Sequence, residues 1–305
     1  MMMYASLILG FVLLIKGADY FVEASSSIAK KLRIPSIIIG LTIVAFGTSA
    51  PELAVSTTAA LSGNNDIAIG NVIGSNIFNL LVVLGACGAI HPFRVRLRWD
   101  YITSISAGIL LLIMMITNLN ISRLEGIILL VFFVSFVGFT IRDAIVNRVP
   151  KEIETKSLPI WISAIYIVLG LSAIIWGGNL VVDNASAIAA SFGLSQTLIG
   201  LTIVAFGTSL PELITSIVAS RKGENGLALG NVIGSNLFNI LMVLGISASI
   251  HPIKVNPLSI YDAAFFILIS LVTFLFCKTK KELNRYEGIF MIVTYFIYMF
   301  YIVVR

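Results

Sequence analysis

The sequence predicts an all-α polytopic membrane protein, with about ten transmembrane helices in two inverted-topology five-helix repeats. Of its 305 residues, 58% are hydrophobic and only 11% are charged, whereas soluble domains carry about 25% charged residues. Roughly ten apolar runs reach the ~20 residues that a spanning helix needs. A long internal repeat adds the arrangement: GLTIVAFGTSAPEL at 40–53 returns as GLTIVAFGTSLPEL at 200–213, identical at thirteen of fourteen positions.

The repeat continues beyond this motif at the same offset of 160 residues. GNVIGSNIFN at 70–79 becomes GNVIGSNLFN at 230–239. A later echo pairs the RLEG that starts at Arg123 with the RYEG that starts at Arg285. We therefore expect each repeat to extend through its fifth helix.

The apolar runs define the expected helices in chain order. The first run lacks a basic leader and a convincing cleavage site, so we interpret it as a retained helix and not as a signal peptide. A polar linker at 142–158 separates a first repeat, 1–141, with its motif region at 40–80, from a second repeat, 159–305, with its motif region at 200–240. The predicted spans are 4–22, 35–61, 67–90, 101–119, 124–141, 159–181, 195–219, 227–250, 259–277 and 286–304.

Five spans per repeat require the second copy to enter the membrane from the opposite side. Cytoplasmic loops are enriched in Lys and Arg, and sixteen of the twenty basic residues fall in alternate loops. This asymmetry predicts a multi-pass protein of the cell membrane with both termini extracellular. Because the basic residues are spread over loops, we expect the lipid bilayer and no nucleic acid as a partner, and we infer no protein partner.

The second span carries a polar face interrupted by proline. Pro51 cannot donate a hydrogen bond to the carbonyl of Gly47, and its ring favours a kink. Irregular backbone at membrane depth is tolerated where it is buried in protein or lines a wet cavity. The residues that share this face by helical spacing are Ala45, Thr48, Ser49 and Glu52, repeated as Ala205, Thr208, Ser209 and Glu212.

The third span carries a polar stripe with a period of four. Its members are Asn71, Ser75 and Asn79, repeated as Asn231, Ser235 and Asn239. Pooled with the proline-broken face, these residues offer two carboxylates, hydroxyls, amides and backbone carbonyls, all of them oxygen ligands. Such a set with a charge of −2 suits a hard cation, calcium especially, and sodium can use the same oxygens. The sequence predicts no cofactor.

Simpler interpretations exist for each feature alone. Serine and threonine on membrane helices often only pack against neighbours, and a lone glutamate can be structural. The conjunction of kink, face and carboxylate, found twice at one offset, favours a functional site, because a buried carboxylate costs several kcal/mol unless it is compensated. Lys16 and Asp19 are interpreted as a helix-face pair, and the two His-Pro pairs at His91 and His251 as helix stops.

Cysteine usage predicts neither a disulfide framework nor a metal site. Cys87 and Cys277 both fall in apolar runs without metal-ligand spacing. A nucleophile–base pair or a cofactor motif is also missing, so the sequence does not predict an enzyme.

GTSAPEL with GNVIGSNIFN, repeated as GTSLPEL with GNVIGSNLFN, resembles the α-repeats of the calcium/cation antiporter superfamily, in its sodium/calcium exchanger branch. The resemblance covers essentially the whole chain and implies alternating access, with Ca²⁺ and Na⁺ competing at one midplane site. It also implies that the first and sixth helices move as a gating pair. By motif position, the implied ligands are Glu52, Glu212, Thr48, Ser49, Thr208, Ser209, Ser75, Asn79, Ser235 and Asn239, with Ala45 and Ala205 acting through their carbonyls.

One residue departs from the family pattern. Many relatives have an aspartate where this chain has Asn239, and potassium-dependent members rely on an acid there. This departure argues against potassium dependence and leaves the sodium stoichiometry open.

The predicted function is secondary antiport of Ca²⁺ against Na⁺, in the direction of calcium extrusion. A proton-coupled Ca²⁺/H⁺ antiporter uses the same carboxylates and stays open as an alternative. A passive cation channel is a further alternative, although two proline-broken helices that meet at one point suit occlusion better than an open pore.

Overall fold

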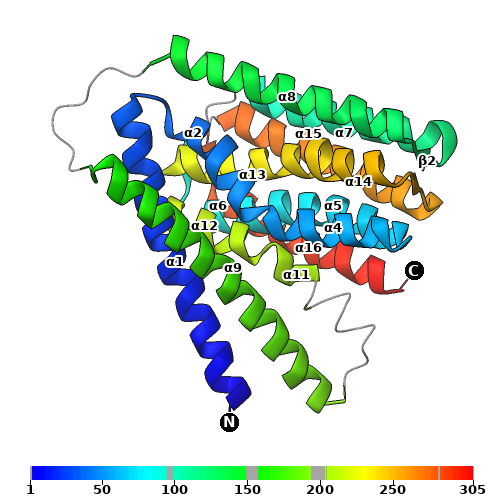
Figure 1. Cartoon of the computed structure of the whole chain (residues 1–305), viewed down its shortest axis with the longest axis horizontal. Coiled ribbons are helices and arrows are strands. Elements are labelled where there is room, and N and C mark those ends of the chain that lie inside the picture. The colour runs from blue at the N-terminus through cyan, green and yellow to red at the C-terminus, as the bar shows by residue number, and fades with distance from the viewer. Residues whose placement is uncertain are drawn as a thin grey trace.

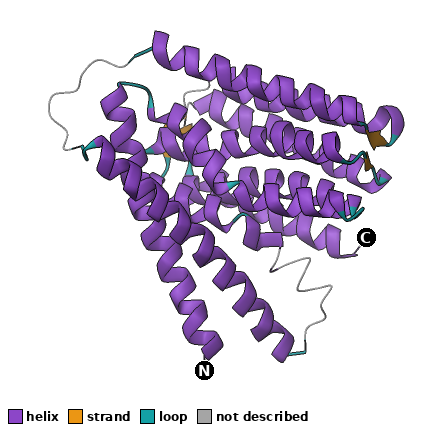
Figure 2. Ribbon diagram, in the orientation of Figure 1, coloured by secondary structure: helices purple, strands orange, loops and turns teal. Residues whose placement is uncertain are grey.

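The computed structural model describes residues 2–94, 99–148, 157–193, 203, 205–280 and 282–304. Helices dominate the described chain, and the only strands in it are four two-residue segments (Figure 2). Eight of these helices are long and apolar enough to cross a membrane, and one bent helix pair makes a ninth candidate. The predicted span 195–219 lies partly outside the described residues, so the expected count of ten stays a prediction.

The helices follow the predicted runs closely, with two exceptions in length. The first and sixth predicted spans, 4–22 and 159–181, continue as helix to Leu32 and Ser191. Alanine-rich and serine-rich segments extend both helices at their C-terminal ends, because alanine has the highest helix propensity and serine only a moderate penalty. The long helices are α1 (Met2–Leu32), α7 (Trp99–Asn118), α8 (Arg123–Val146), α9 (Ile160–Ser191), α15 (Pro257–Lys280) and α16 (Arg285–Val304).

Helices α1 and α9 form a close pair that slants across the remaining bundle (Figure 1). Glycines let their backbones approach. A Cβ atom added to Gly17 would come within 2.8 Å of the carbonyl oxygen of Gly170, and one added to Gly177 within 2.7 Å of that of Gly10. Small residues at such crossings are the usual basis of tight packing between membrane helices.

The interior of the bundle consists of shorter, interrupted helices from both halves. Three of these helical runs are each interrupted by a π-helical turn. Such turns occur often at functional sites. The first-half elements are α2 (Ser36–Ile39), η1 (Gly40–Val44), α3 (Ala45–Thr48), α4 (Ala50–Leu61), α5 (Asn65–Phe78), η2 (Asn79–Leu84) and α6 (Gly85–Ile90). The second-half elements are α11 (Ala205–Thr208), α12 (Leu210–Arg221), α13 (Asn225–Leu237), η4 (Phe238–Val243) and α14 (Leu244–Ile250).

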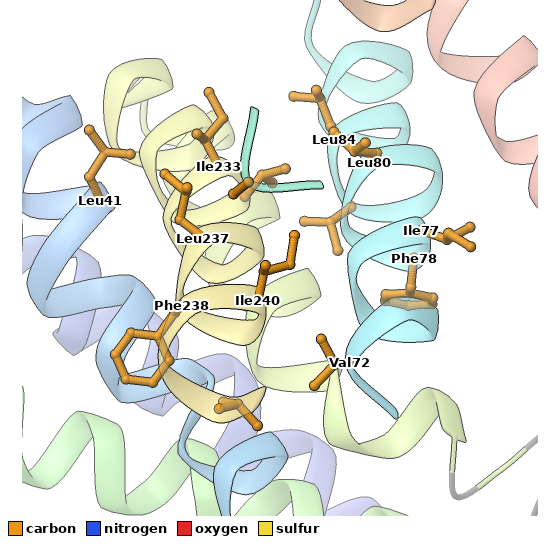
Figure 3. Packing of buried hydrophobic residues seen from close by; sticks show 14 of the residues in the cluster. Leu41, Val72, Ile77, Phe78, Leu80, Leu84, Ile233, Leu237, Phe238 and Ile240 are labelled. Carbon is orange, nitrogen blue, oxygen red and sulfur yellow. The ribbon is translucent and has the colours of Figure 1, made fainter. Parts of the chain in front are cut away.

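The two halves pack against each other through apolar side chains and through glycine. Figure 3 shows Leu80 and Leu84 of η2 near Ile233 and Leu237 of α13 in one buried cluster. Where η1 crosses α13 the backbones nearly touch, because a Cβ atom on Gly40 would lie 2.5 Å from the carbonyl oxygen of Leu227. This contact fixes the distance between the two central runs.

Short strand pairs tie loops of the two halves together. Strand β1 (Phe93–Arg94) pairs antiparallel with β4 (Glu282–Leu283), and β2 (Asn120–Ile121) pairs antiparallel with β3 (Ile253–Lys254). Helix α8 starts with a capping box in which Ser122 and Glu125 satisfy each other's backbone N–H groups, and it ends at Val146, inside the predicted linker.

Ion pairs join α1 to the turn between α12 and α13. Lys222 Nζ lies 2.8 Å from Asp19 Oδ1, and Lys30 Nζ lies 3.4 Å from Glu224 Oε1. Ser26 Oγ also donates a hydrogen bond to Glu224. The expected partnership of Asp19 with Lys16 is therefore replaced by one with Lys222, from the other half of the chain.

Candidate functional site

Both proline motifs break their helices at a serine. The run from Ser36 to Leu61 bends by 49° between α3 and α4, at Ser49, whose φ of −85° and ψ of 8° leave the helical range. Ser209 takes nearly the same conformation, with φ −95° and ψ 8°, between α11 and α12. Pro51 stands in the first turn of α4, where its missing N–H costs no helical hydrogen bond. The kink expected from the sequence is confirmed in the first half.

Glu52 follows the first break and is fully buried. Two hydroxyls donate to the same carboxylate oxygen: Ser209 Oγ to Oε1 at 3.1 Å and Ser75 Oγ to Oε1 at 3.4 Å. Ser75 belongs to the same half of the chain, whereas Ser209 comes from the other half. The carboxylate of one half is thus held by the break of the other.

Glu212 has the equivalent surroundings and is also fully buried. Ser49 Oγ donates to Glu212 Oε1 at 2.9 Å, and Ser235 Oγ donates to the same oxygen at 3.4 Å. The serine pairs are exchanged between the halves in the same way as around Glu52. This reciprocity places the two breaks side by side at the centre of the protein.

The first asparagine of each GNVIGSN motif holds the backbone of the broken helix. Asn71 Nδ2 donates to the carbonyl oxygen of Glu52 at 3.2 Å and to Ser56 Oγ at 2.9 Å. Asn231 Nδ2 does the same with the carbonyl oxygen of Glu212 at 3.4 Å and with Ser216 Oγ at 2.9 Å. These amides use their donors on the broken helix of their own half and so support the backbone of each glutamate.

Several buried oxygen atoms at the site have no hydrogen-bond partner among the described residues. Nearly all buried polar atoms in proteins are paired with protein or water, so a group of unpaired oxygens marks a place that a cation can occupy. They are Glu52 Oε2, Glu212 Oε2, Asn79 Oδ1, Asn239 Oδ1 and Thr208 Oγ1.

Two of the remaining predicted ligands, Thr48 and the carbonyl group of Ala45, are already engaged. Thr48 Oγ1 lies 3.1 Å from Asn231 Oδ1 and 3.1 Å from the carbonyl oxygen of Val44. The carbonyl oxygen of Ala45 accepts the N–H of Ser49 at 3.0 Å; a carbonyl has a second lone pair that stays available. Ala205 is the first residue of α11.

The candidate ligands are all oxygen donors. No cluster of three or more His, Cys, Asp and Glu side chains occurs among the described residues. Two carboxylates with hydroxyl and amide oxygens suit Ca²⁺ or Na⁺, whose preferred ligands are oxygen. Both cysteines are buried, and neither is among the candidate ligands.

Two further asparagines at this centre were missed from the sequence. Asn76 and Asn236 each contact an asparagine of the opposite half. Their signal was present, since both motifs read GSN followed by two apolar residues and a second asparagine. The polar stripe with a period of four does not include them, because that spacing selects residues on only one face of the helix.

Comparisons with known proteins agree with this geometry. A family model described as "Sodium/calcium exchanger protein" matches residues 2–142 and 162–304. The putative antiporter CaxA of Alkalimonas amylolytica is 38% identical and is covered to 96%, as is this chain. The sodium/calcium exchanger MaX1 of Methanosarcina acetivorans is 33% identical, with 97% of this chain and 98% of MaX1 covered.

Solved structures give the same result at the level of the fold. The sodium-calcium exchanger NCX_Mj, soaked with Na⁺ and Ca²⁺, superposes with a TM-score of 0.86 at 32% identity, over 97% of each chain. The family model covers both halves of the chain, and these relatives span it almost end to end. The chain therefore belongs to the sodium/calcium exchanger family, a family of membrane transporters and not of enzymes.

Proposed function

We propose that the chain exchanges Ca²⁺ for Na⁺ across the cell membrane by alternating access and thereby exports calcium. The observation that carries this proposal is the reciprocal pair of buried carboxylates. In the described part of the chain, Glu52 and Glu212 each keep one oxygen free of protein donors, while the other oxygen accepts from two serines. Burying two such charges without a cation is strongly unfavourable.

The charge of this pair explains coupling. One Ca²⁺ neutralises two ionised carboxylates, and so do two Na⁺. The two kinds of ion share ligands and repel each other at short range, so they exclude each other from the site. A third Na⁺ per cycle would make exchange electrogenic.

We assign the transported cations to the predicted set of twelve residues, and the structure supports its members unequally. The free oxygens of the two glutamates, Asn79, Asn239 and Thr208 are the strongest candidates. The serine hydroxyls now donate to the carboxylates and can still offer lone pairs to an ion. The full set is Glu52, Glu212, Thr48, Ser49, Thr208, Ser209, Ser75, Asn79, Ser235, Asn239, Ala45 and Ala205.

Alternating access requires a part that moves. Helices α1 and α9 pack against each other through facing glycines. The pair lies outside the central run of broken helices (Figure 1). We assign the gating movement to this pair, as a unit against the rest. Ten spans in two inverted repeats, with both termini outside, complete the proposed topology.

Proton coupling is the second candidate, because the same carboxylates can carry protons in place of sodium. The name of one relative supports sodium, since MaX1 is called a sodium/calcium exchanger. The name CaxA identifies only a putative antiporter. The four serines around the carboxylates also favour sodium, because a proton carrier does not need a cage of oxygen ligands.

Flux in proteoliposomes separates these candidates. Vesicles loaded with Na⁺ and diluted into Na⁺-free medium should accumulate ⁴⁵Ca²⁺, and a potential that is positive inside the vesicles should change the rate if exchange is electrogenic. A Glu52→Gln/Glu212→Gln double variant is the matched control. Uptake that follows an imposed pH gradient in Na⁺-free medium would establish proton coupling. Uptake down the calcium gradient with no countercation would indicate a channel.

A further inference from the structure

Four asparagines meet between the halves, on the helical runs whose Ser75 and Ser235 donate to the two carboxylates, and all are at most 1% exposed. Asn239 Nδ2 donates to Asn76 Oδ1 at 3.1 Å, and Asn79 Nδ2 donates to Asn236 Oδ1 at 3.2 Å. Each bond joins the two halves. In both, the amide nitrogen of a candidate ligand is occupied, and its Oδ1 has no partner among the described residues.

The orientation of an amide matters at a cation site. An asparagine side chain has a carbonyl oxygen at one branch and an NH₂ group at the other. Turned by half a rotation about its last bond, Asn239 would present hydrogen atoms to the ion in place of the oxygen. The hydrogen bond to Asn76 prevents this turn, because an NH₂ group is the only branch that can donate to Asn76 Oδ1.

Asn76 is itself held in one orientation. Its Nδ2 donates to the backbone carbonyl oxygen of Asn236 at 3.3 Å, and this oxygen can only accept. Asn76 therefore must place its nitrogen towards the backbone and its oxygen towards Asn239. The backbone carbonyl oxygen of Asn236 therefore sets the direction of two hydrogen bonds, the one that Asn76 donates and the one that Asn76 accepts from Asn239.

The other arm is less constrained. Asn236 Oδ1 accepts from Asn79, but Asn236 Nδ2 finds no partner in the part of the chain that the structure describes. No backbone acceptor fixes the direction of this amide. The Asn76–Asn239 arm is thus more rigidly oriented than the Asn236–Asn79 arm.

We infer that Asn76 and Asn236 are positioning residues that orient the ligand amides of Asn239 and Asn79 across the repeat interface, so that their oxygens face the transported cation. This inference rests on the proposed function of the same site. It assigns to the two GSN asparagines a role that none of the cation's direct ligands has. It also makes the cation site depend on contact between the two halves.

A double-mutant cycle tests the inference. A carboxyl group carries an oxygen at both branches, so turning residue 239 no longer replaces the oxygen by an NH₂ group once it is an aspartate. Asn76→Leu keeps the side-chain shape but removes the acceptor. In the wild-type background it should weaken equilibrium ⁴⁵Ca²⁺ binding to the purified full chain by roughly tenfold to a hundredfold, as loss of ligand-supporting partners does at metal sites. In the Asn239→Asp background the same change should cost little or even strengthen binding.

The second arm provides an independent check. Asn236→Leu should weaken binding less than Asn76→Leu, and Asn79→Asp should remove its effect. If Asn76→Leu does not fold, as judged by thermal unfolding in detergent, Asn76→Ala and the Asn236 arm carry the same comparison. An equal loss in both backgrounds would show a packing role and overturn the inference, as would unchanged binding in Asn76→Leu.

The proposed function and the orientation role of the asparagines are tested separately. If wild-type protein binds ⁴⁵Ca²⁺ and exchanges it, but the cycle shows no coupling, only the orientation role is wrong. If wild-type protein binds no ⁴⁵Ca²⁺, the proposed function is wrong and the inference falls with it.

Discussion

Replacing Glu52 or Glu212 by glutamine separates charge from shape at the candidate site. In each carboxylate, Oε1 accepts from two serine hydroxyls, and Oε2 accepts from no donor among the described residues. A glutamine that keeps the serine bonds must place its NH₂ group where the free oxygen stood. A glutamine that turns its oxygen to the cation gives up both serine bonds, each contributing about 1 kcal/mol.

The loss of charge adds to this conflict. At about 2.4 Å and an effective dielectric constant of about 20, one carboxylate attracts a divalent ion by roughly 14 kcal/mol and a monovalent ion by roughly 7 kcal/mol. Desolvation cancels most of both values. If a tenth of the divalent value is lost in each variant, calcium affinity falls about tenfold, and the loss for sodium is half as large in free energy.

We expect each glutamine variant to lose nearly all exchange of ⁴⁵Ca²⁺ and to shift its competition curve towards sodium. Sodium-loaded proteoliposomes and equilibrium ⁴⁵Ca²⁺ binding measure the two effects. The matched control is Glu282→Gln, which removes one exposed carboxylate of the same type. Wild-type rate and affinity in either site variant would show that this carboxylate is structural.

Two further predictions concern packing and closure. Gly40→Ala should lower the free energy of unfolding by about 1–3 kcal/mol, because its Cβ would meet backbone 2.5 Å away. Thermal unfolding in detergent measures this loss against Gly138→Ala, which meets nothing within 4 Å; equal stability of the two variants contradicts it. Lys222→Gln should loosen α1 only slightly, because partly exposed ion pairs contribute about 0.2–1 kcal/mol. In this variant, spin labels at Lys31 and Arg221 should show a small population at a longer distance. Exchanging the charges of Lys222 and Asp19 should make that population smaller than in Lys222→Gln. An unchanged distance distribution in Lys222→Gln would show that this ion pair does not hold α1.

The sequence predicted the two glutamates and their serine neighbours because the same pattern occurs in both repeats, which a chance pattern would not do. The same spacing that placed Ser49 and Glu52 on one helical face could not say that Ser49 bonds to Glu212. Such an exchange depends on how the halves dock, which helical periodicity does not encode. The proline kink was predictable from local chemistry, since the ring of Pro51 disfavours continuing the helix from the preceding turn.

Other features were out of reach for similar reasons. The π-helical turns at Gly40 and Asn79 follow from packing between runs, and no residue type specifies them. The first and sixth spans proved longer than predicted, because a hydropathy run ends at the first polar residues while the helix continues through them. Asn76 was not predicted because it lies off the polar stripe with a period of four. Its hydrogen-bond partner is in the other half of the chain, which helical spacing cannot indicate.

Asn239→Asp is the change in which charge, orientation and protonation meet. The position faces Asn76 Oδ1, an acceptor 3.1 Å from the present Asn239 Nδ2, and a carboxylate has no hydrogen to donate. Asn76 cannot turn without setting its own oxygen against the carbonyl oxygen of Asn236. Only the protonated form of the new acid can make this hydrogen bond, and it would then bind the cation through its other oxygen.

This geometry sets the sign of the pH effect. While the acid is protonated, the variant should bind ⁴⁵Ca²⁺ much as the wild type does, since both present one neutral oxygen. As the pH is raised and the proton leaves, a third negative charge faces the ion, and calcium should bind more tightly and leave more slowly. Adding Asn76→Leu removes the acceptor that holds the proton, so the tightening should begin at lower pH. A variant whose affinity follows the wild type at every pH, or whose pH dependence ignores Asn76→Leu, would contradict the hydrogen-bond direction on which the prediction depends.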